Sequence, residues 1–158
     1  ADGGHVQKTI ELFHALERNP EFPQHKLTVL NNSVLKACAK RGDFIQARSW
    51  YEKMCANAVR LNEKTFGKLV EAAAKAGKID VAERWFHECK RKGFSLDIVV
   101  HGAMVDACAK AGRADLAGVW FDRISAAGLA PNAIAYSALM AAHARSGNSE
   151  AALLLLER

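Results

Sequence analysis

Four basic residues recur at a constant interval of 35 residues, and they are the first candidates for binding chemistry. They are Lys40, Lys75, Lys110 and Arg145. A regular row of cations can neutralise successive phosphates of a polyanionic backbone. Each of the four is also expected in the last turn of a helix, where the helix dipole favours positive charge. Both roles stay open from the sequence, and the formal net charge of +5 is compatible with a polyanionic partner.

The other chemically reactive residue types show no arrangement typical of a catalytic or metal site. The four cysteines contain no C-x-x-C pair, and no H-x-x-x-H spacing accompanies them. Carboxylates stand mostly one helical turn from lysine or arginine, as on a solvated helix surface. Cys38 and Cys108 are expected to be small buried residues in a reducing compartment. We therefore expect no enzyme activity, no metal site and no cofactor.

The same interval of 35 residues organises the whole chain. Three residue types mark it: Trp50, Trp85 and Trp120; Gly42, Gly77, Gly112 and Gly147; Ala47, Ala82, Ala117 and Ala152. An internal period of this length is typical of solenoids, in which each unit is a small motif that stacks on its neighbours.

Each unit has the apolar spacing of two helices. Ala47, Trp50, Tyr51 and Met54 fall at i, i+3, i+4 and i+7, which places them on one face of a helix. A second apolar stripe precedes it in every unit: Val34-Leu35-Cys38, Leu69-Val70-Ala73, Met104-Val105-Cys108 and Leu139-Met140-His143. The glycine between the stripes is expected to end the first helix in a left-handed conformation. We expect the tryptophans to pack in the core between hairpins.

Counted from Thr28, the complete units span residues 28–62, 63–97 and 98–132. Residues 1–27 are expected to hold the second helix of a partial repeat and a proline-containing link. Residues 133–158 are expected to form a partial fourth repeat, with Leu155 and Leu156 in place of the aromatic pair. We expect a segment of a longer array, or ends covered by another chain. No apolar run approaches the roughly 18 residues of a membrane-spanning helix, and any targeting segment is expected outside these residues.

Residues 98–132, IVVHGAMVDACAKAGRADLAGVWFDRISAAGLAPN, resemble a pentatricopeptide repeat over their full length. The resemblance to P-type repeats of this family extends over roughly residues 28–158. Tetratricopeptide repeats have 34 residues and a different signature, so they match less well. The resemblance implies an all-α fold, an α-solenoid with a right-handed superhelix of tandem helix-turn-helix repeats. It also implies location in a mitochondrion or plastid and binding of single-stranded RNA, one base per repeat.

The resemblance further implies which residues recognise bases. In the family, the fifth and the last residue of a repeat face the base edge, and the second residue stacks on the base. The implied pairs are Asn32 with Asn62, Gly67 with Asp97 and Gly102 with Asn132, followed by Ser137 without a partner. The implied stacking residues are Val29, Lys64, Val99 and Ile134. The Asn32–Asn62 pair implies a pyrimidine preference.

Two of the three implied pairs contain a glycine, which has no side chain to hydrogen-bond a base. We therefore expect RNA binding along the concave face with weak base preference. Structural roles are the alternative: Asn62, Asp97 and Asn132 each precede a helix and can be its N-cap. Gly67 and Gly102 lie early in a helix, where close packing is the alternative explanation. The alternative function is a protein-interaction scaffold or accessory subunit of a large organellar complex, such as a ribosome or a photosynthetic or respiratory assembly.

Overall fold

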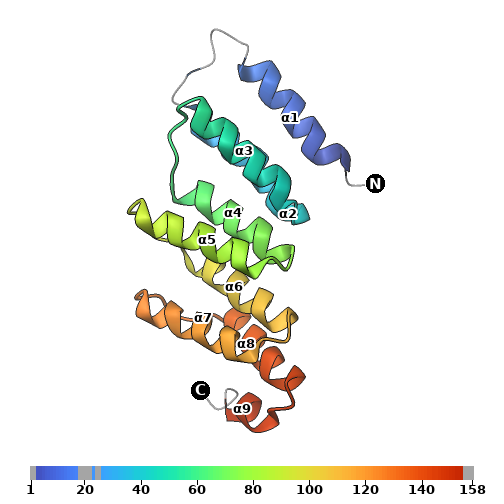
Figure 1. Cartoon of the computed structure of the whole chain (residues 1–158), viewed down its shortest axis with the longest axis vertical. Helices are drawn as coiled ribbons and strands as arrows, with labels where there is room; N and C mark the ends of the chain where they lie inside the picture. The colour runs from blue at the N-terminus through green and yellow to red at the C-terminus, as the bar shows by residue number, and fades with distance from the viewer. Residues whose placement is uncertain (1–2, 18–22, 24–25, 155–158) are drawn as a thin grey trace.

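The computed structural model describes residues 3–17, 23 and 26–154, and every regular element in these residues is a helix. The helices are α1 (Gly3–Glu17), α2 (Leu27–Arg41), α3 (Phe44–Ala56), α4 (Glu63–Lys75), α5 (Ile79–Arg91), α6 (Ile98–Lys110), α7 (Ala114–Ala126), α8 (Ala133–Arg145) and α9 (Ser149–Leu154). Successive helices pair into hairpins that stack along one axis (Figure 1), so the all-α solenoid predicted from the sequence is confirmed. None of these described helices has the length and apolar character needed to cross a membrane. Leu155, Leu156 and most of the proline-containing link lie outside the described residues.

Short-range signals in the sequence set where the helices begin and end. Gly42, Gly77, Gly112 and Gly147 all have φ between 68° and 76°, the left-handed conformation that the sequence predicts after the first helix of a hairpin. Side chains cap the N-termini of α4, α6 and α8. Asn62, Asp97 and Asn132 accept hydrogen bonds from backbone N–H groups three residues on, at 3.0–3.1 Å. The predicted N-cap role of these three residues is therefore confirmed.

The helices form two layers that are spaced differently. In the inner layer α2 packs on α4, α4 on α6 and α6 on α8. In the outer layer, within the described residues, no Cα atom of α3 lies within 8 Å of α5, and none of α5 within 8 Å of α7. Large aromatic side chains span these wider gaps, with ring centroids 4.7 Å apart for Tyr51–Trp85 and 4.8 Å for Phe86–Trp120. Because the outer spacing is wider, the inner layer forms the concave side of the solenoid.

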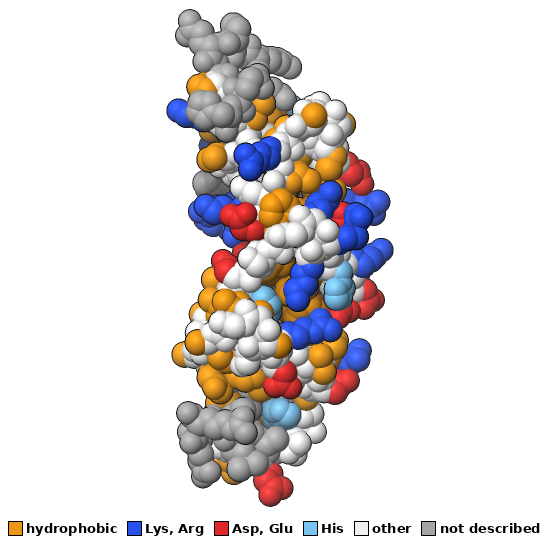
Figure 2. Space-filling view, turned by 90° about the vertical axis from the view of Figure 1, so that its left-hand side faces the viewer, with side chains coloured by type: hydrophobic (Ala, Val, Ile, Leu, Met, Phe, Trp, Pro, Cys, Tyr) orange, Lys and Arg blue, Asp and Glu red, His pale blue; other side chains and the backbone are white. Residues whose placement is uncertain are grey.

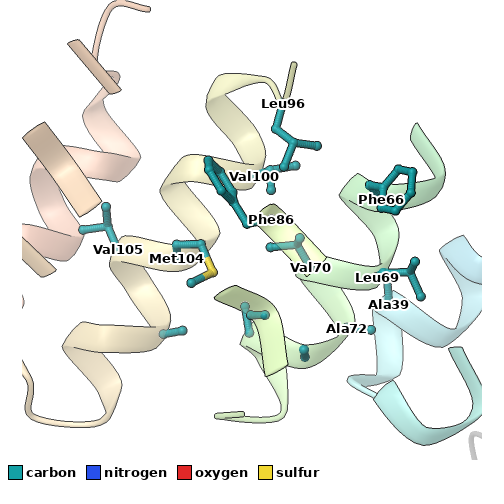
Figure 3. Close-up of a cluster of buried hydrophobic side chains, with 14 of the residues drawn as sticks. Ala39, Phe66, Leu69, Val70, Ala72, Phe86, Leu96, Val100, Met104 and Val105 are labelled. Carbon is teal, nitrogen blue, oxygen red and sulfur yellow. The ribbon is translucent and has the colours of Figure 1, made fainter. Parts of the chain in front are cut away.

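The core is a continuous apolar seam between the layers. Figure 3 shows side chains of α4, α5 and α6, including Val70, Phe86 and Met104, that point into the space between neighbouring helices. The first-helix stripes of the three complete units lie in this seam, and Val34, Val70 and Val105 are fully buried. Of the fourth stripe, Leu139 is buried, whereas Met140 and His143 are only partly buried. Burial of apolar surface between stacked hairpins is the main stabilising contribution, since no single hairpin can cover its own apolar faces.

The tryptophans are not equivalent, contrary to the expectation from their spacing. Trp50 and Trp120 are buried, whereas Trp85 is only partly buried and packs against Tyr51. In its unit the neighbouring Phe86 occupies the buried position instead. Trp50 has a polar partner there, because its Nε1 donates a hydrogen bond of 3.0 Å to Asn31 Oδ1. At the position of Asn31, the unit of Trp85 has Phe66, which cannot accept such a bond.

Candidate nucleic-acid interface

A groove runs along the concave face and consists of two adjoining hollows. The first has a volume of about 800 Å³ and lies where α2, α4 and α6 begin. The second, of about 470 Å³, continues toward the ends of the same helices. Lys36, Lys68 and Glu71 line both hollows and join them. Figure 2 shows the side of the molecule on which α4, α6 and α8 begin, with Lys and Arg side chains gathered over its upper and middle parts.

Ten of the fifteen candidate residues from the sequence, which are the positions implied by the resemblance and the basic row, line this groove. The first hollow contains Val29, Asn32, Asn62, Lys64, Gly67 and Asp97, and the second contains Lys40, Lys75, Val99 and Lys110. The other five do not line either hollow: Gly102, Asn132, Ile134, Ser137 and Arg145. The groove therefore unites the implied residues of the first two complete units and leaves out most of those that follow.

Asn32 and Asn62 come together at the start of α4. The Asn32 Nδ2 group donates a hydrogen bond of 3.1 Å to Asn62 Oδ1, although 30 residues separate them in the chain. Asn62 Oδ1 also accepts from the Thr65 backbone N–H at 3.1 Å, so this oxygen serves the helix cap as well. Both asparagines are only partly buried. Their remaining amide groups can therefore reach a ligand in the groove.

The pair formed by Gly67 and Asp97 differs in its surroundings. A Cβ atom placed on Gly67 would lie 3.3 Å from Val100 Cγ2, so α6 approaches α4 closely at this point. Close packing, the structural alternative for this glycine, is therefore supported. Asp97 uses its side chain to accept the Val100 N–H at 3.1 Å, and its carbonyl accepts from His101 Nδ1 at 2.9 Å. Asp97 thus has a cap role, and its glycine partner offers no hydrogen-bonding group to a base.

Gly102 is not explained in the same way. A Cβ atom on Gly102 would meet nothing within 4 Å, so packing does not require a glycine here. Its implied partner Asn132 caps α8 through the Ala135 N–H at 3.0 Å. Ser137, the corresponding residue of the fourth unit, is exposed on α8.

The implied stacking positions are all exposed. Val29, Val99 and Ile134 are 69%, 58% and 70% exposed. Lys64 is exposed at the same position of the second unit and offers a charge in place of an apolar surface. Exposed aliphatic side chains at one repeated position provide flat apolar contacts suitable for a planar ligand group.

The row of four basic residues has contacts that the sequence did not predict. Lys75 Nζ donates to the carbonyl of Lys40, and Arg145 Nη1 donates to the carbonyl of Ala109 at 2.9 Å. Each bond runs to the C-terminal end of the preceding inner helix, where free carbonyls accept cations readily. Lys110 instead pairs with Asp106 at 2.6 Å. Stabilisation of a helix C-terminus by a cation is thus supported. Lys75 and Arg145, however, stabilise the end of the neighbouring inner helix rather than that of their own helix.

Four other lysines contribute to the groove, and sequence reasoning overlooked three of them as cations of this surface. Lys36 and Lys68 line both hollows, and Lys64 and Lys90 line the first. Lys68 is paired with Glu71 at 2.8 Å. Among the described residues, Lys36, Lys40 and Lys64 have no carboxylate within 4.0 Å. Unpaired positive charge of the groove therefore lies on α2 and at the start of α4. Lys90 on α5, which also has no carboxylate partner among the described residues, lies over the Phe86 ring.

The buried cysteines are not reactive groups, since burial keeps their thiols protonated. Desolvation raises the pKa of the buried Cys38, Cys89 and Cys108 thiols to about 11, so each is a protonated, unreactive thiol at neutral pH. Within residues 3–17, 23 and 26–154, no group of three or more His, Cys, Asp or Glu side chains is placed to hold a metal ion.

Stacked hairpins with a groove along the inner layer define a helical-repeat protein of the α-solenoid class. Residues 17–158 match the family described as the pentacotripeptide-repeat region of PRORP. The chain belongs to this family, and the resemblance to pentatricopeptide repeats is confirmed. A comparison with curated proteins finds no match.

Solved structures share the fold. The PPR domain of Arabidopsis thaliana protein-only RNase P 1 (PRORP1), in complex with tRNA, is 19% identical with a TM-score of 0.78, covering 98% of this chain and 80% of that chain. The pentatricopeptide repeat protein PPR10 from maize is 22% identical with a TM-score of 0.57, covering 98% of this chain and 27% of that chain. PPR10 in complex with an 18-nt psaJ RNA element is 23% identical with a TM-score of 0.51 and the same coverage. This chain thus spans about a quarter of the PPR10 structures.

Proposed function

We propose that this chain is a non-enzymatic RNA-binding module that holds single-stranded RNA along its concave groove with weak base preference. The observation that supports this most directly is the groove itself, because it is lined by unpaired cations and by the implied base-recognition residues of the first two complete units. Structures of similar fold were solved with RNA: the PRORP1 domain with tRNA and PPR10 with an 18-nt RNA element.

The phosphate backbone is proposed to follow the basic residues of the inner helices. Lys36, Lys40 and Lys64 have no competing carboxylate, so their full charge is available to phosphates. Lys75, Lys110 and Arg145 are proposed as additional contacts, weakened by their existing partners. Binding that depends on such contacts releases counterions and weakens as salt rises.

Bases are proposed to rest on the exposed second positions of the repeats. Val29, Val99 and Ile134 supply apolar surface, and Lys64 supplies a cation in the second unit. Recognition of a base edge by two side chains is proposed at one place, between Asn32 and Asn62, with a preference for pyrimidines. The other proposed edge positions, Gly67, Asp97, Gly102, Asn132 and Ser137, offer at most one side chain per base, which is why the overall preference is weak. Location in a mitochondrion or plastid is part of the same proposal.

The test is a titration of labelled, unstructured RNA by fluorescence anisotropy at several salt concentrations. The triple variant Lys36→Gln, Lys40→Gln and Lys64→Gln should lower the affinity and reduce the slope of log K against log salt by about 2, if each lysine contacts one phosphate. A charge-matched control replaces Arg48, Arg84 and Arg91, which are exposed on the outer helices α3 and α5. Loss of binding in the control but not in the groove variant would contradict the proposal.

A tRNA transcript should be titrated in parallel, because the similar PRORP1 structure contains tRNA. Tighter binding of the unstructured RNA supports a single-stranded ligand, and tighter binding of tRNA would replace that part of the proposal. The second candidate is a protein-interaction scaffold, favoured by the exposed Val99 and Ile134 on α6 and α8. Absence of binding to either RNA at low salt would favour the scaffold.

A further inference from the structure

We propose that Thr65 is a positioning residue that orients the Asn32 amide for base recognition. The inference rests on the proposed RNA-binding function, but its structural part can be tested without RNA. Thr65 is fully buried in the first turn of α4, so it does not face the groove itself. It acts through the two asparagines that do.

Thr65 closes a ring of hydrogen bonds between two repeats. Its Oγ1 accepts from the Asn62 backbone N–H at 3.2 Å and donates to Asn32 Oδ1 at 2.9 Å. Asn32 Nδ2 then donates to Asn62 Oδ1 at 3.1 Å, and that oxygen also accepts the Thr65 backbone N–H at 3.1 Å. The hydroxyl also lies 3.2 Å from Asn62 Oδ1, so the two amide oxygens share its proton, with the shorter contact to Asn32. Every donor in the ring meets an acceptor, so the ring stabilises one direction of the Asn32 amide.

The fixed direction decides what a base would encounter. With its oxygen held by Thr65 and one N–H held by Asn62, the Asn32 amide keeps one N–H donor and one oxygen lone pair. The Asn62 Nδ2 group makes no hydrogen bond with the described residues and keeps both of its donors. A flipped Asn32 amide would place nitrogen against the hydroxyl and oxygen against Asn62 Oδ1. The second contact opposes two acceptors, and the first takes the Asn32 oxygen away from the Thr65 hydroxyl, so Asn62 and Thr65 together disfavour the flip.

The ring is complete at this boundary alone among the described repeats. Residues that correspond to Thr65 in the next two units are Val100 and Ala135, which have no hydroxyl. Residues that correspond to Asn32 there are Gly67 and Gly102. Val100 still allows Asp97 to cap α6, so a valine at this position is compatible with the cap.

The experiment compares Thr65→Val with Thr65→Ser. Valine keeps the shape and removes the hydroxyl, whereas serine keeps the hydroxyl. The readout is the ratio of affinities for short oligo(U) or oligo(C) to oligo(A). Thr65→Val should lower this ratio by about 2–10-fold, the range expected for loss of one hydrogen bond, and leave oligo(A) binding unchanged. Thr65→Ser should restore the ratio. A purely structural role would instead weaken all three oligonucleotides equally.

A second, independent experiment tests whether recognition can be gained in another repeat. Gly102→Asn together with Ala135→Thr would rebuild the ring around the existing Asn132, where an added Cβ has free space. The double variant should raise the pyrimidine preference above that of Gly102→Asn alone. Equal preference in the two variants would contradict a role for the hydroxyl.

A third experiment, by NMR, needs no RNA. In ¹H–¹⁵N spectra, the Asn32 side-chain amide protons should be well separated and protected from exchange in the native chain, and lose both features in Thr65→Val. Unchanged Asn32 resonances would overturn the positioning role even if RNA binds. If no RNA binds to any variant, the proposed function fails, and the spectra still decide whether Thr65 orients Asn32.

Discussion

Arg145 donates a hydrogen bond of 2.9 Å to the backbone carbonyl of Ala109, which lies near the end of the preceding inner helix. Lys75 makes the corresponding contact with the carbonyl of Lys40. These bonds connect consecutive repeats near the ends of their first helices. Part of the basic row therefore stabilises the stacking of hairpins, in addition to any role in binding phosphate.

Members of the basic row should therefore differ in how much they contribute to the stability of the fold. Arg145→Met should lower the free energy of unfolding by about 1 kcal/mol, because it removes a charge-assisted bond to a helix end. Lys40→Met should change it by less than about 0.5 kcal/mol, since the Lys40 side chain makes no hydrogen bond or ion pair with the described residues. Urea denaturation followed by circular dichroism measures both. Equal losses in the two variants would contradict the capping role of Arg145.

The tryptophans should differ in their contribution to stability. Trp120 is fully buried and lies 4.8 Å from Phe86, with the Arg123 guanidinium 4.2 Å above its ring. Trp120→Ala should therefore cost about 3–5 kcal/mol. The partly buried Trp85 should cost less when replaced by alanine, about 1–3 kcal/mol. Thermal and urea unfolding of the two variants test the order, and a larger loss for Trp85 would show that its burial is misassigned.

The glycines at the fifth position of the second and third repeats, Gly67 and Gly102, should respond oppositely to alanine. Gly102→Ala should stabilise the fold by about 0.5–1 kcal/mol, because the added methyl group has free space and alanine favours the helix. Gly67→Ala should gain nothing or lose stability, since its Cβ would press against Val100 at 3.3 Å. Melting temperatures of the single variants provide the comparison. A gain at Gly67 equal to that at Gly102 would show that α4 and α6 are less closely packed than described.

Alkaline pH should weaken the fold through its buried thiols. Burial raises the pKa of Cys38, Cys89 and Cys108 from 9.0 to about 11. Between these values the unfolded chain loses thiol protons that the folded chain retains, so the free energy of unfolding falls as pH rises from about 9 to about 11. Cys108→Ala should make this fall shallower, and Ala73 at the equivalent position shows that alanine fits there. Cys55→Ala is the control, because Cys55 is exposed; an identical slope in all three proteins would contradict the assignment.

The features predicted correctly from the sequence are those determined by neighbouring residues. The conformation of Gly42 depends on the turn in which it lies, and the Asn62 cap depends on a backbone group three residues away. Helical spacing alone also places Val34 and Leu35 in the core. Such local rules repeat in each unit, and the period of 35 residues makes them visible.

The features that sequence reasoning missed join different repeats. The bonds from Thr65 to Asn32 and from Arg145 to Ala109 span 33 and 36 residues, so they depend on how two hairpins stack. Lys36 and Lys68 were overlooked because no basic residue follows them at the interval of 35. A signal was present, since Lys36 stands four residues after Asn32 and four before Lys40, on the same helix face.

The most direct test of the central claim is to locate the RNA-binding surface by NMR. Backbone ¹H–¹⁵N spectra should be recorded while unstructured RNA is added to the chain. The account predicts that shifts concentrate on α2, α4 and the start of α6, including Asn32, Lys36 and Lys64. Shifts confined to the outer helices α3, α5 and α7, or no shifts at low salt, would contradict it.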